Sequence, residues 1–220
     1  MYRLFLLCAL IPVSLSAAAL KPEDWAVEQM PGGTVEFQPN QIMIRDARGC
    51  TVWLRQKLTA PVAIHFTATL VGGDRATDRI SDLNCFWMAN DSRGPGAPFL
   101  PPWRRSGKFS EYDSLLTYYV GYAANNNSTT RFRRYDGTTE RPLLPEHDLS
   151  GPQFKLRKDV PVKIRLIARD GVAEYWRDGE RIFVFRDPAP LASGWFAFRT
   201  VRSHIRIEHF VVESLTESSK

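Results

Sequence analysis

The sequence is poor in cysteine and histidine, with three cysteines and four histidines among 220 residues. None of their spacings resembles a zinc site, which excludes a structural zinc domain. Only Cys50 and Cys85 would remain after removal of an N-terminal export signal. An oxidising compartment would permit one disulfide between them, and two separate buried thiols fit their apolar surroundings equally well.

Long apolar runs are absent outside the N-terminus. There, Arg3 precedes an apolar run over Leu4–Leu15, and Ala17-Ala18-Ala19 offers a cleavage site before Leu20. This arrangement predicts a secretory signal peptide at residues 1–19. The run is too short to span a bilayer, so we expect a secreted or periplasmic protein without stable membrane insertion.

A strong excess of basic charge is also absent. The chain has 29 lysines and arginines against 24 aspartates and glutamates, a formal charge of +5. Nucleic-acid binding usually needs a denser basic stripe, so we expect no nucleic-acid partner. Arginine clearly outnumbers lysine, which favours planar, bidentate recognition over bulk charge.

Helical periodicity is nearly absent, and short runs of alternating apolar and polar residues take its place. Gly, Pro, Asn and Asp separate these runs, which is typical of a β-sandwich. The predicted strands are Val35–Phe37, Gln41–Arg45, Thr51–Leu54, Val62–Leu70, Asn84–Ala89, Leu116–Tyr122, Arg131–Tyr135, Val162–Ala168, Ala173–Trp176, Ile182–Phe185, Trp195–Thr200 and Arg206–Val212. With no repeat and no break in composition, residues 20–220 are predicted to form one all-β domain, a two-sheet antiparallel jelly-roll sandwich.

The C-terminal third carries the most diagnostic order of strands and turns. Asp170-Gly171 and Asp178-Gly179 mark two hairpin turns, and Gly194–Arg199 precedes a closing strand. This order resembles the end of concanavalin A-like jelly rolls of the laminin-G and glucanase type. The resemblance implies that the second hairpin lies at the sandwich edge and that the last strand pairs near the first.

The blocks Ser81–Asp91, Thr129–Tyr135 and Phe198–Thr200 occur together in this chain. Their combination resembles a family of secreted bacterial proteins classed as a domain of unknown function. Members of that family are often encoded beside polysaccharide-degrading enzymes. The resemblance implies a jelly-roll sandwich in a carbohydrate context, and it supplies no established reaction.

Aromatic, arginine and amide side chains gather on two neighbouring predicted strands. Tyr118–Tyr122 holds three tyrosines, Asn125–Asn127 is an amide cluster, and Thr130–Tyr135 holds three arginines. Aromatic faces stack on sugar rings, arginine forks pair with carboxylates, and amides hydrogen-bond hydroxyl groups. Together they predict a groove for an anionic carbohydrate, although the same residues could simply cover a solvated sheet edge.

Alternation along the strands selects the residues of this groove, and the long loop Asn90–Asp113 is predicted to wall it. Gly121 would leave room for a sugar backbone to approach. The predicted catalytic residues are Tyr119, Arg131, Arg133, Asn84 and His204, and the predicted substrate-binding residues are Trp103, Tyr122, Tyr135, Asn125 and Arg199.

β-Elimination from a uronate fits these residues. The reaction needs a group that neutralises the carboxylate, with an acid and a base near the scissile bond. We expect Arg131 and Arg133 to hold the carboxylate and Asn84 to assist them. Tyr119 would be the base or acid, with His204 or His147 as its proton partner. As a base at neutral pH, the tyrosine would need its pKa lowered by these cations from about 10.

Three functions from different classes therefore remain. The first is a polysaccharide lyase that cleaves an acidic glycan, and the alternative is a carbohydrate-binding module without turnover, because the same groove serves both. The third is a structural or partner-binding laminin-G-like domain, which predicts an open apolar patch in place of a polar groove. A glycoside hydrolase is less favoured, since the Glu-x-Asp-x-x-Glu triplet of glucanases is missing. No cofactor is expected: Asp82 and Asp91 could ligate calcium, but no spacing signature accompanies them.

Overall fold

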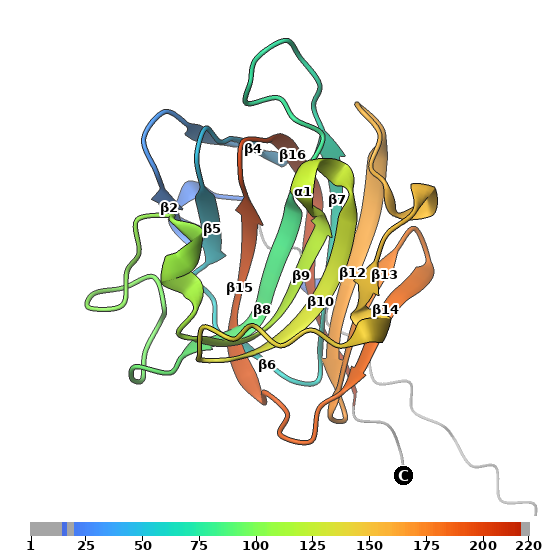
Figure 1. Cartoon of the computed structure of the whole chain (residues 1–220). Helices are drawn as coiled ribbons and strands as arrows, with labels where there is room; N and C mark the ends of the chain where they lie inside the picture. Colours follow the sequence, from blue (N-terminus) through green and yellow to red (C-terminus); the bar gives the residue numbers. More distant parts are fainter. Residues whose placement is uncertain (1–14, 17–19, 217–220) are drawn as a thin grey trace, which may run out of the picture.

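Two antiparallel β-sheets lie face to face in the structure (Figure 1). The computed structural model describes residues 15–16 and 20–216. Most of the predicted signal peptide, residues 1–14 and 17–19, lies outside the described residues. Within the described part of the chain, no helix combines the length and the apolar character needed to cross a membrane.

Each sheet contains eight strands, seven of which follow one another side by side. Sheet A has the order β14 (Glu180–Arg186), β13 (Val172–Arg177), β12 (Pro161–Arg169), β7 (Val62–Leu70), β16 (His204–Ser214), β4 (Gln41–Arg45) and β3 (Thr34–Gln38), and β1 (Leu15–Ser16) pairs with β16. Sheet B has the order β11 (Asp148–Leu149), β10 (Thr129–Asp136), β9 (Leu115–Ala123), β8 (Leu83–Asp91), β15 (Ser193–Thr200), β5 (Cys50–Leu54) and β2 (Trp25–Gln29), and β6 (Leu58–Thr59) pairs with β15. The helical turns are η1 (Pro22–Asp24), η2 (Phe109–Tyr112), α1 (Ala124–Asn127), η3 (Pro145–His147) and η4 (Pro152–Phe154).

The main hydrophobic core fills the space between the two sheets. Alternate residues of β9, such as Tyr118 and Val120, point into it and are almost fully buried. Phe198 of sheet B meets Phe66 of sheet A edge-on, with ring centroids 4.9 Å apart. Burial of apolar surface of this kind is the dominant favourable term in folding, so the period-two pattern of the strands decides which face of each sheet turns inward.

The predicted fold class is confirmed, and each predicted strand overlaps a strand of the structure. The two expected hairpin turns join β12 to β13 and β13 to β14, and β14 is the edge strand of sheet A. Asp170, Gly171, Asp178 and Gly179 all have positive φ, as type I′ turns require. Residues of β2 escaped prediction because Trp25 and Glu28, three positions apart, are its buried residues, which breaks strict alternation.

Cys50 and Cys85 are both free thiols in the core. They lie on β5 and β8, which flank β15 in sheet B. Burial raises the pKa of both thiols above their usual value. Of the two arrangements that the sequence left open, the structure has the separate thiols, which are packing residues without the thiolate character that reactivity needs.

Candidate functional site

The outer face of sheet B, turned away from the core, carries a row of polar residues across seven strands. Paired residues on neighbouring strands point to the same face of a sheet. Successive Cα partners, here called the polar row, are Glu28, Thr51, Arg199, Asn84, Gly121, Arg131 and Asp148. Gly121 is the one position in this row without a side chain, so it leaves a gap between Asn84 and Arg131.

Two residues further along the strands, a second row of Cα partners is mostly apolar. This aromatic row consists of Ala26, Trp53, Ala197, Phe86, Tyr119 and Arg133. The long loop after β8 packs Phe99 against Trp53 and Tyr112 against Phe86, with ring centroids 6.0 and 5.5 Å apart. Hydrocarbon therefore covers this half of the outer face, and the loop fills part of the groove that it was predicted to wall.

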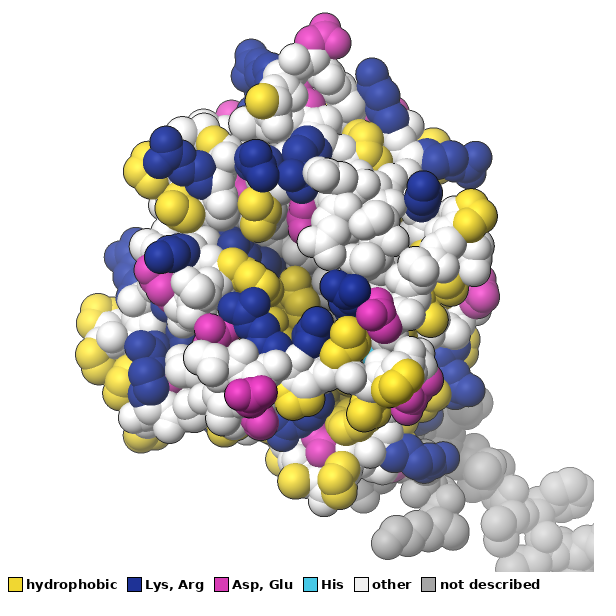
Figure 2. All heavy atoms as spheres, viewed as in Figure 1, with side chains coloured by type: hydrophobic (Ala, Val, Ile, Leu, Met, Phe, Trp, Pro, Cys, Tyr) yellow, Lys and Arg dark blue, Asp and Glu magenta, His cyan; other side chains and the backbone are white. Residues whose placement is uncertain are grey.

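Over β8, β9 and β10 the outer face stays open and forms a pocket of about 490 Å³. Figure 2 shows it as a hollow with an apolar floor and basic side chains around the rim. Strands β8, β9 and β10, the turn α1 and several loop residues contribute to this pocket. We name it the sheet-B pocket. Its lining residues are Arg79, Asp82, Asn84, Phe109, Tyr119, Gly121, Ala124, Asn125, Asn126, Thr129, Arg131, Arg133, Tyr135, Arg141, Val201 and Arg202.

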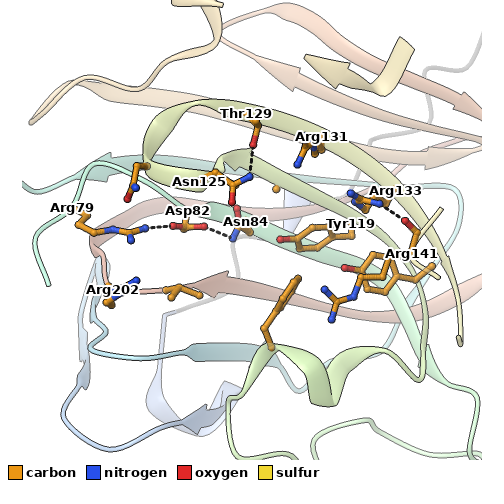
Figure 3. A pocket seen from close by; sticks show the side chains of 16 residues that line it. Arg79, Asp82, Asn84, Tyr119, Asn125, Thr129, Arg131, Arg133, Arg141 and Arg202 are labelled. Atoms are coloured by element: carbon orange, nitrogen blue, oxygen red, sulfur yellow. Dashed lines mark hydrogen bonds and ion pairs between the residues drawn. The ribbon is translucent and has the colours of Figure 1, made fainter. Parts of the chain in front are cut away.

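Five arginines surround the sheet-B pocket (Figure 3). Three of them already have carboxylate partners. The nitrogen–oxygen distances are 2.6 Å for Arg79–Asp82, 2.7 Å for Arg131–Asp148 and 2.5 Å for Arg141–Asp113. The hydrogen bond from Arg131 holds the pKa of Asp148 below its usual value. Among the described residues, Arg133 and Arg202 have no carboxylate within ion-pair distance, so the pocket carries an excess of positive charge.

Arg133 is the arginine best placed to receive an anion. It lies on β10 directly opposite Tyr119 of β9. Its Nη1 donates a hydrogen bond to the backbone carbonyl of Arg141, which fixes one side of the guanidinium. A guanidinium has five N–H donors, so most of them remain for a ligand.

Tyr119 lies on the floor of the pocket and is 6% exposed. Its ring lies across Gly121, because a Cβ atom at position 121 would be 3.2 Å from the tyrosine hydroxyl oxygen. Burial raises the pKa of Tyr119 well above its usual value, and Arg199 and Arg141 offset this only in part. The side chain is therefore a neutral phenol at neutral pH, whereas the predicted base required a lowered pKa.

The amide cluster forms one rim of the pocket through an unusual backbone. Ala123, Asn125, Asn126 and Asn127 all have φ between 52° and 63°. Asparagine tolerates this left-handed region better than most residues. Asn127 holds the turn in place through hydrogen bonds to both backbone groups of Leu156, at 2.8 and 2.9 Å. The exposed side chain of Asn126 is then free to meet a ligand at the rim.

Most of the predicted site residues lie together in the sheet-B pocket, on β8, β9, β10 and the turn α1. They are Asn84, Tyr119, Asn125, Arg131, Arg133 and Tyr135. Alternation found the five strand residues because β8, β9 and β10 are neighbours in one sheet with the expected faces outward, whereas Asn125 came from the amide cluster. Two of these six residues are less available for the predicted roles. Arg131 already donates hydrogen bonds to Asp148, and burial raises the pKa of Tyr135 to about 12.

Four predicted residues do not line the pocket. Tyr122 faces the core, where it stacks on Tyr175, so it is not available as a substrate contact. His204 belongs to sheet A, where its Nδ1 lies 2.9 Å from Arg45, so it is not a proton partner of Tyr119. Trp103 and Arg199 are the other two.

The Trp103 ring lies in the long loop beneath the guanidinium of Arg93, with 5.1 Å between them. Its Nε1 donates to the carbonyl of Pro95. Trp103 is therefore occupied within its own loop and does not reach the pocket. Arg199 lies on the correct face of β15 but is buried behind Phe109.

Sequence reasoning found Asn125 in the turn α1 but missed the pocket residues that come from the other loops. Arg79, Phe109, Arg141 and Arg202 reach the pocket from segments far apart in the chain. A period-two pattern gives no signal for such positions. The described residues also contain no group of three or more His, Cys, Asp or Glu side chains arranged to hold a metal ion.

Solved structures with a similar sandwich share little sequence with this chain. A Bacillus subtilis protein of unknown function with a galectin-like fold has a TM-score of 0.68 at 17% identity, covering 93% of this chain and 100% of that one. The carbohydrate-binding module CBM66 from Bacillus subtilis has a TM-score of 0.59 at 8% identity, covering 87% and 96%. The exoplasmic/lumenal domain of VIP36, solved with Ca²⁺ and Man3GlcNAc, has a TM-score of 0.55 at 11% identity, covering 94% and 92%. At these identities the likeness shows the fold.

No curated protein sequence matches the chain. A family model described as a domain of unknown function (DUF6250) matches residues 44–210. That range contains β8, β9, β10 and β15, the strands on which the pocket is built. The chain therefore belongs to the family described as domain of unknown function DUF6250.

Proposed function

We propose that the sheet-B pocket binds a carbohydrate that carries negative charge, and that the chain acts as a carbohydrate-binding domain. The observation that carries the proposal is Arg133, which lines an open pocket and has no carboxylate partner among the described residues. A uronate carboxylate would supply that partner through two parallel hydrogen bonds. An acidic polysaccharide or oligosaccharide is therefore the ligand that we expect.

The remaining pocket residues offer the contacts that a sugar ring needs. Parts of the Tyr119 and Tyr135 rings line the floor, and aromatic surface packs well against the C–H groups of a sugar. Asn84 and Asn126 offer amide groups to hydroxyls. Two structural relatives support a sugar ligand, since one is a carbohydrate-binding module and the other was solved with Man3GlcNAc.

A polysaccharide lyase is the second candidate, because Tyr119, Arg133 and Asn84 line one pocket. The difficulty is the base: burial raises the pKa of Tyr119, and no histidine lines the pocket within the described part of the chain. We expect acidic polymers to bind without any rise in the ultraviolet absorbance that unsaturated uronates produce. A rise that Tyr119→Phe abolishes would favour the lyase.

Arg133→Ala is expected to weaken binding of an acidic polysaccharide by about tenfold or more, because hydrogen bonds to charged groups contribute about 1.5–3 kcal/mol. Affinity electrophoresis through gels that contain polygalacturonate, alginate or glucuronan measures the loss. Arg165→Ala is the matched control, since it removes the same charge from a half-exposed arginine of sheet A.

Two outcomes would contradict the proposal. Equal losses in Arg133→Ala and Arg165→Ala would mean that the polymers respond to overall charge and not to the pocket. Failure of the wild-type protein to bind any acidic polymer, under conditions in which it is folded, would remove the proposed ligand class altogether.

A further inference from the structure

Two arginines are buried on the outer face of sheet B, and they differ in their hydrogen bonding. Arg105 and Arg199 are 6% and 2% exposed, and each guanidinium lies close to the Tyr112 ring, at 5.2 and 5.4 Å. Every side-chain nitrogen of Arg105 donates a hydrogen bond. None of the three side-chain nitrogens of Arg199 has a hydrogen-bond partner among the described residues.

A buried guanidinium without partners is costly. Burying an ion without compensating hydrogen bonds costs several kcal/mol, and native proteins satisfy nearly all buried polar groups. Arg105 shows that this face can satisfy a buried arginine fully. The lack of hydrogen-bond partners therefore comes from the particular position of Arg199. A bound anion could accept the hydrogen bonds that its guanidinium leaves unused.

Asn84 lies directly opposite Arg199 on the neighbouring strand β8. It is also buried, and its Oδ1 atom has no hydrogen-bond partner among the described residues. Asn84 lines the sheet-B pocket, whereas Arg199 does not. Asn84 therefore presents an unused acceptor at the edge of the pocket, next to Arg199 in the polar row. The terminal nitrogens of Arg199 lie near Gly49, since a Cβ atom at position 49 would be 3.2 Å from Nη1 and 3.0 Å from Nη2.

Two rings, Phe109 and Tyr112, lie 5.4 Å from the Arg199 guanidinium, and Phe109 of η2 is the one that also lines the pocket. The Phe109 ring is half-buried and packs against the Tyr119 ring, 5.8 Å away, and the Arg141 guanidinium, 4.4 Å away. Rotation of the Phe109 side chain would therefore break no hydrogen bond while opening the pocket toward Arg199.

We propose that Arg199 and Asn84 form an inner subsite for the carboxylate-bearing end of the bound sugar, reached when the Phe109 ring turns aside. A planar carboxylate matches the two parallel N–H groups of a guanidinium, and a neighbouring sugar hydroxyl can donate to Oδ1 of Asn84. The inner subsite rests on the proposed function and adds a second arginine that binds a carboxylate. Arg133 then binds another carboxylate of the polymer, in the outer part of the ligand.

The proposal predicts that Arg199→Met keeps or gains stability but loses the preference for a carboxylate. Replacing an unpaired buried charge by an apolar side chain of similar length should leave the thermal unfolding temperature unchanged or raise it. The same variant should lose its preference for polygalacturonate over the carboxyl-reduced, neutral polymer by at least about tenfold. Arg165→Met on sheet A is the control for charge, and both polymers are tested by affinity electrophoresis.

A second measurement does not depend on the fold of Arg199→Met. Phenylglyoxal modifies accessible guanidinium groups, and mass spectrometry of the peptide that contains Arg199 reports its rate. We expect slow modification in the wild-type protein, faster modification in Phe109→Ala, and protection in that variant by polygalacturonate but not by the reduced polymer.

Retention of the carboxylate preference in Arg199→Met would overturn the inner subsite, as would absence of protection at Arg199 while Arg133 is protected. A lower unfolding temperature for Arg199→Met together with unprotected Arg199 would assign the residue a structural role. In all these cases the wild-type protein still binds the acidic polymer, so the proposed function survives. Loss of binding in the wild type itself would remove both.

Discussion

Arg105→Met is expected to lower the free energy of unfolding by about 3–5 kcal/mol, the range measured when one partner of a buried ion pair is removed. Arg105 forms an ion pair with Asp91, and the two side chains are 2% and 0% exposed. The variant leaves the Asp91 carboxylate buried, with Arg93 as its one remaining cationic partner among the residues that the structure describes. No other single substitution considered for this chain is expected to affect stability as much.

The expected loss of stability is large because the Arg105 guanidinium hydrogen-bonds several parts of the long loop. Arg105 donates to the carbonyls of Pro98, Trp103 and Glu111, at 2.8, 3.2 and 2.6 Å. It also donates to the hydroxyl of Ser114. These acceptors are spread along the loop from Pro98 to Ser114, so removal of this one side chain takes a hydrogen-bond donor from several parts of the loop at once.

Chemical denaturation of Arg105→Met beside Arg104→Met measures this effect. Arg104 is the exposed neighbour in sequence, so the control removes the same charge and length from solvent. We expect a change within about 0.5 kcal/mol for the control. Similar losses in both variants would show that the ion pair does not hold the loop.

The Asp91 carboxylate also predicts a pH dependence. Burial acts to raise its pKa, but hydrogen bonds from Arg93 and Arg105 outweigh burial, and the pKa lies below its usual value. A carboxyl group that is more acidic in the folded state stabilises the fold above its unfolded pKa of about 4, and the contribution disappears as the pH falls through the folded pKa. Asp91→Asn should therefore flatten the acid limb of the stability profile.

The sequence predicted the sandwich and the open part of the site for the same reason. Period-two alternation determines which side of a strand faces the core, and the connection between β9 and β10 is a short turn that makes them neighbours. Tyr119, Arg133 and Tyr135 could therefore be placed on one face from their spacing alone. The same rule placed Asn84 of β8 on this face.

The parts that escaped prediction depend on contacts between distant segments. Arg105 and Arg199 look alike in the sequence, yet one is fully hydrogen-bonded and the other has no partner among the described residues. Whether each buried arginine finds hydrogen-bond partners depends on the course of the long loop. Tyr122 was misassigned because three tyrosines in five residues indicate an aromatic surface, while alternation turns the third one into the core.

Gly121→Val is expected to reduce the affinity for acidic polysaccharides by about 10–100-fold, because its side chain would occupy the pocket floor and each loss of about 1.4 kcal/mol in binding is tenfold in affinity. Gly121 lies between Asn84 and Arg131 in the polar row. A Cβ atom there would lie 3.2 Å from the Tyr119 hydroxyl and 3.3 Å from its Cε1 atom. The valine side chain would therefore displace the Tyr119 ring and occupy the floor where the sugar is proposed to lie.

The fold should survive this change, since β-branched residues suit strands and an interior glycine weakens them. Gly121→Ala provides the graded comparison: its single methyl group should cause a smaller loss of affinity than valine does. Affinity electrophoresis gives the binding, and thermal unfolding confirms that both variants are folded. Wild-type affinity in a folded Gly121→Val would mean that the ligand does not enter the sheet-B pocket, because no ligand on that floor could tolerate a side chain at its centre.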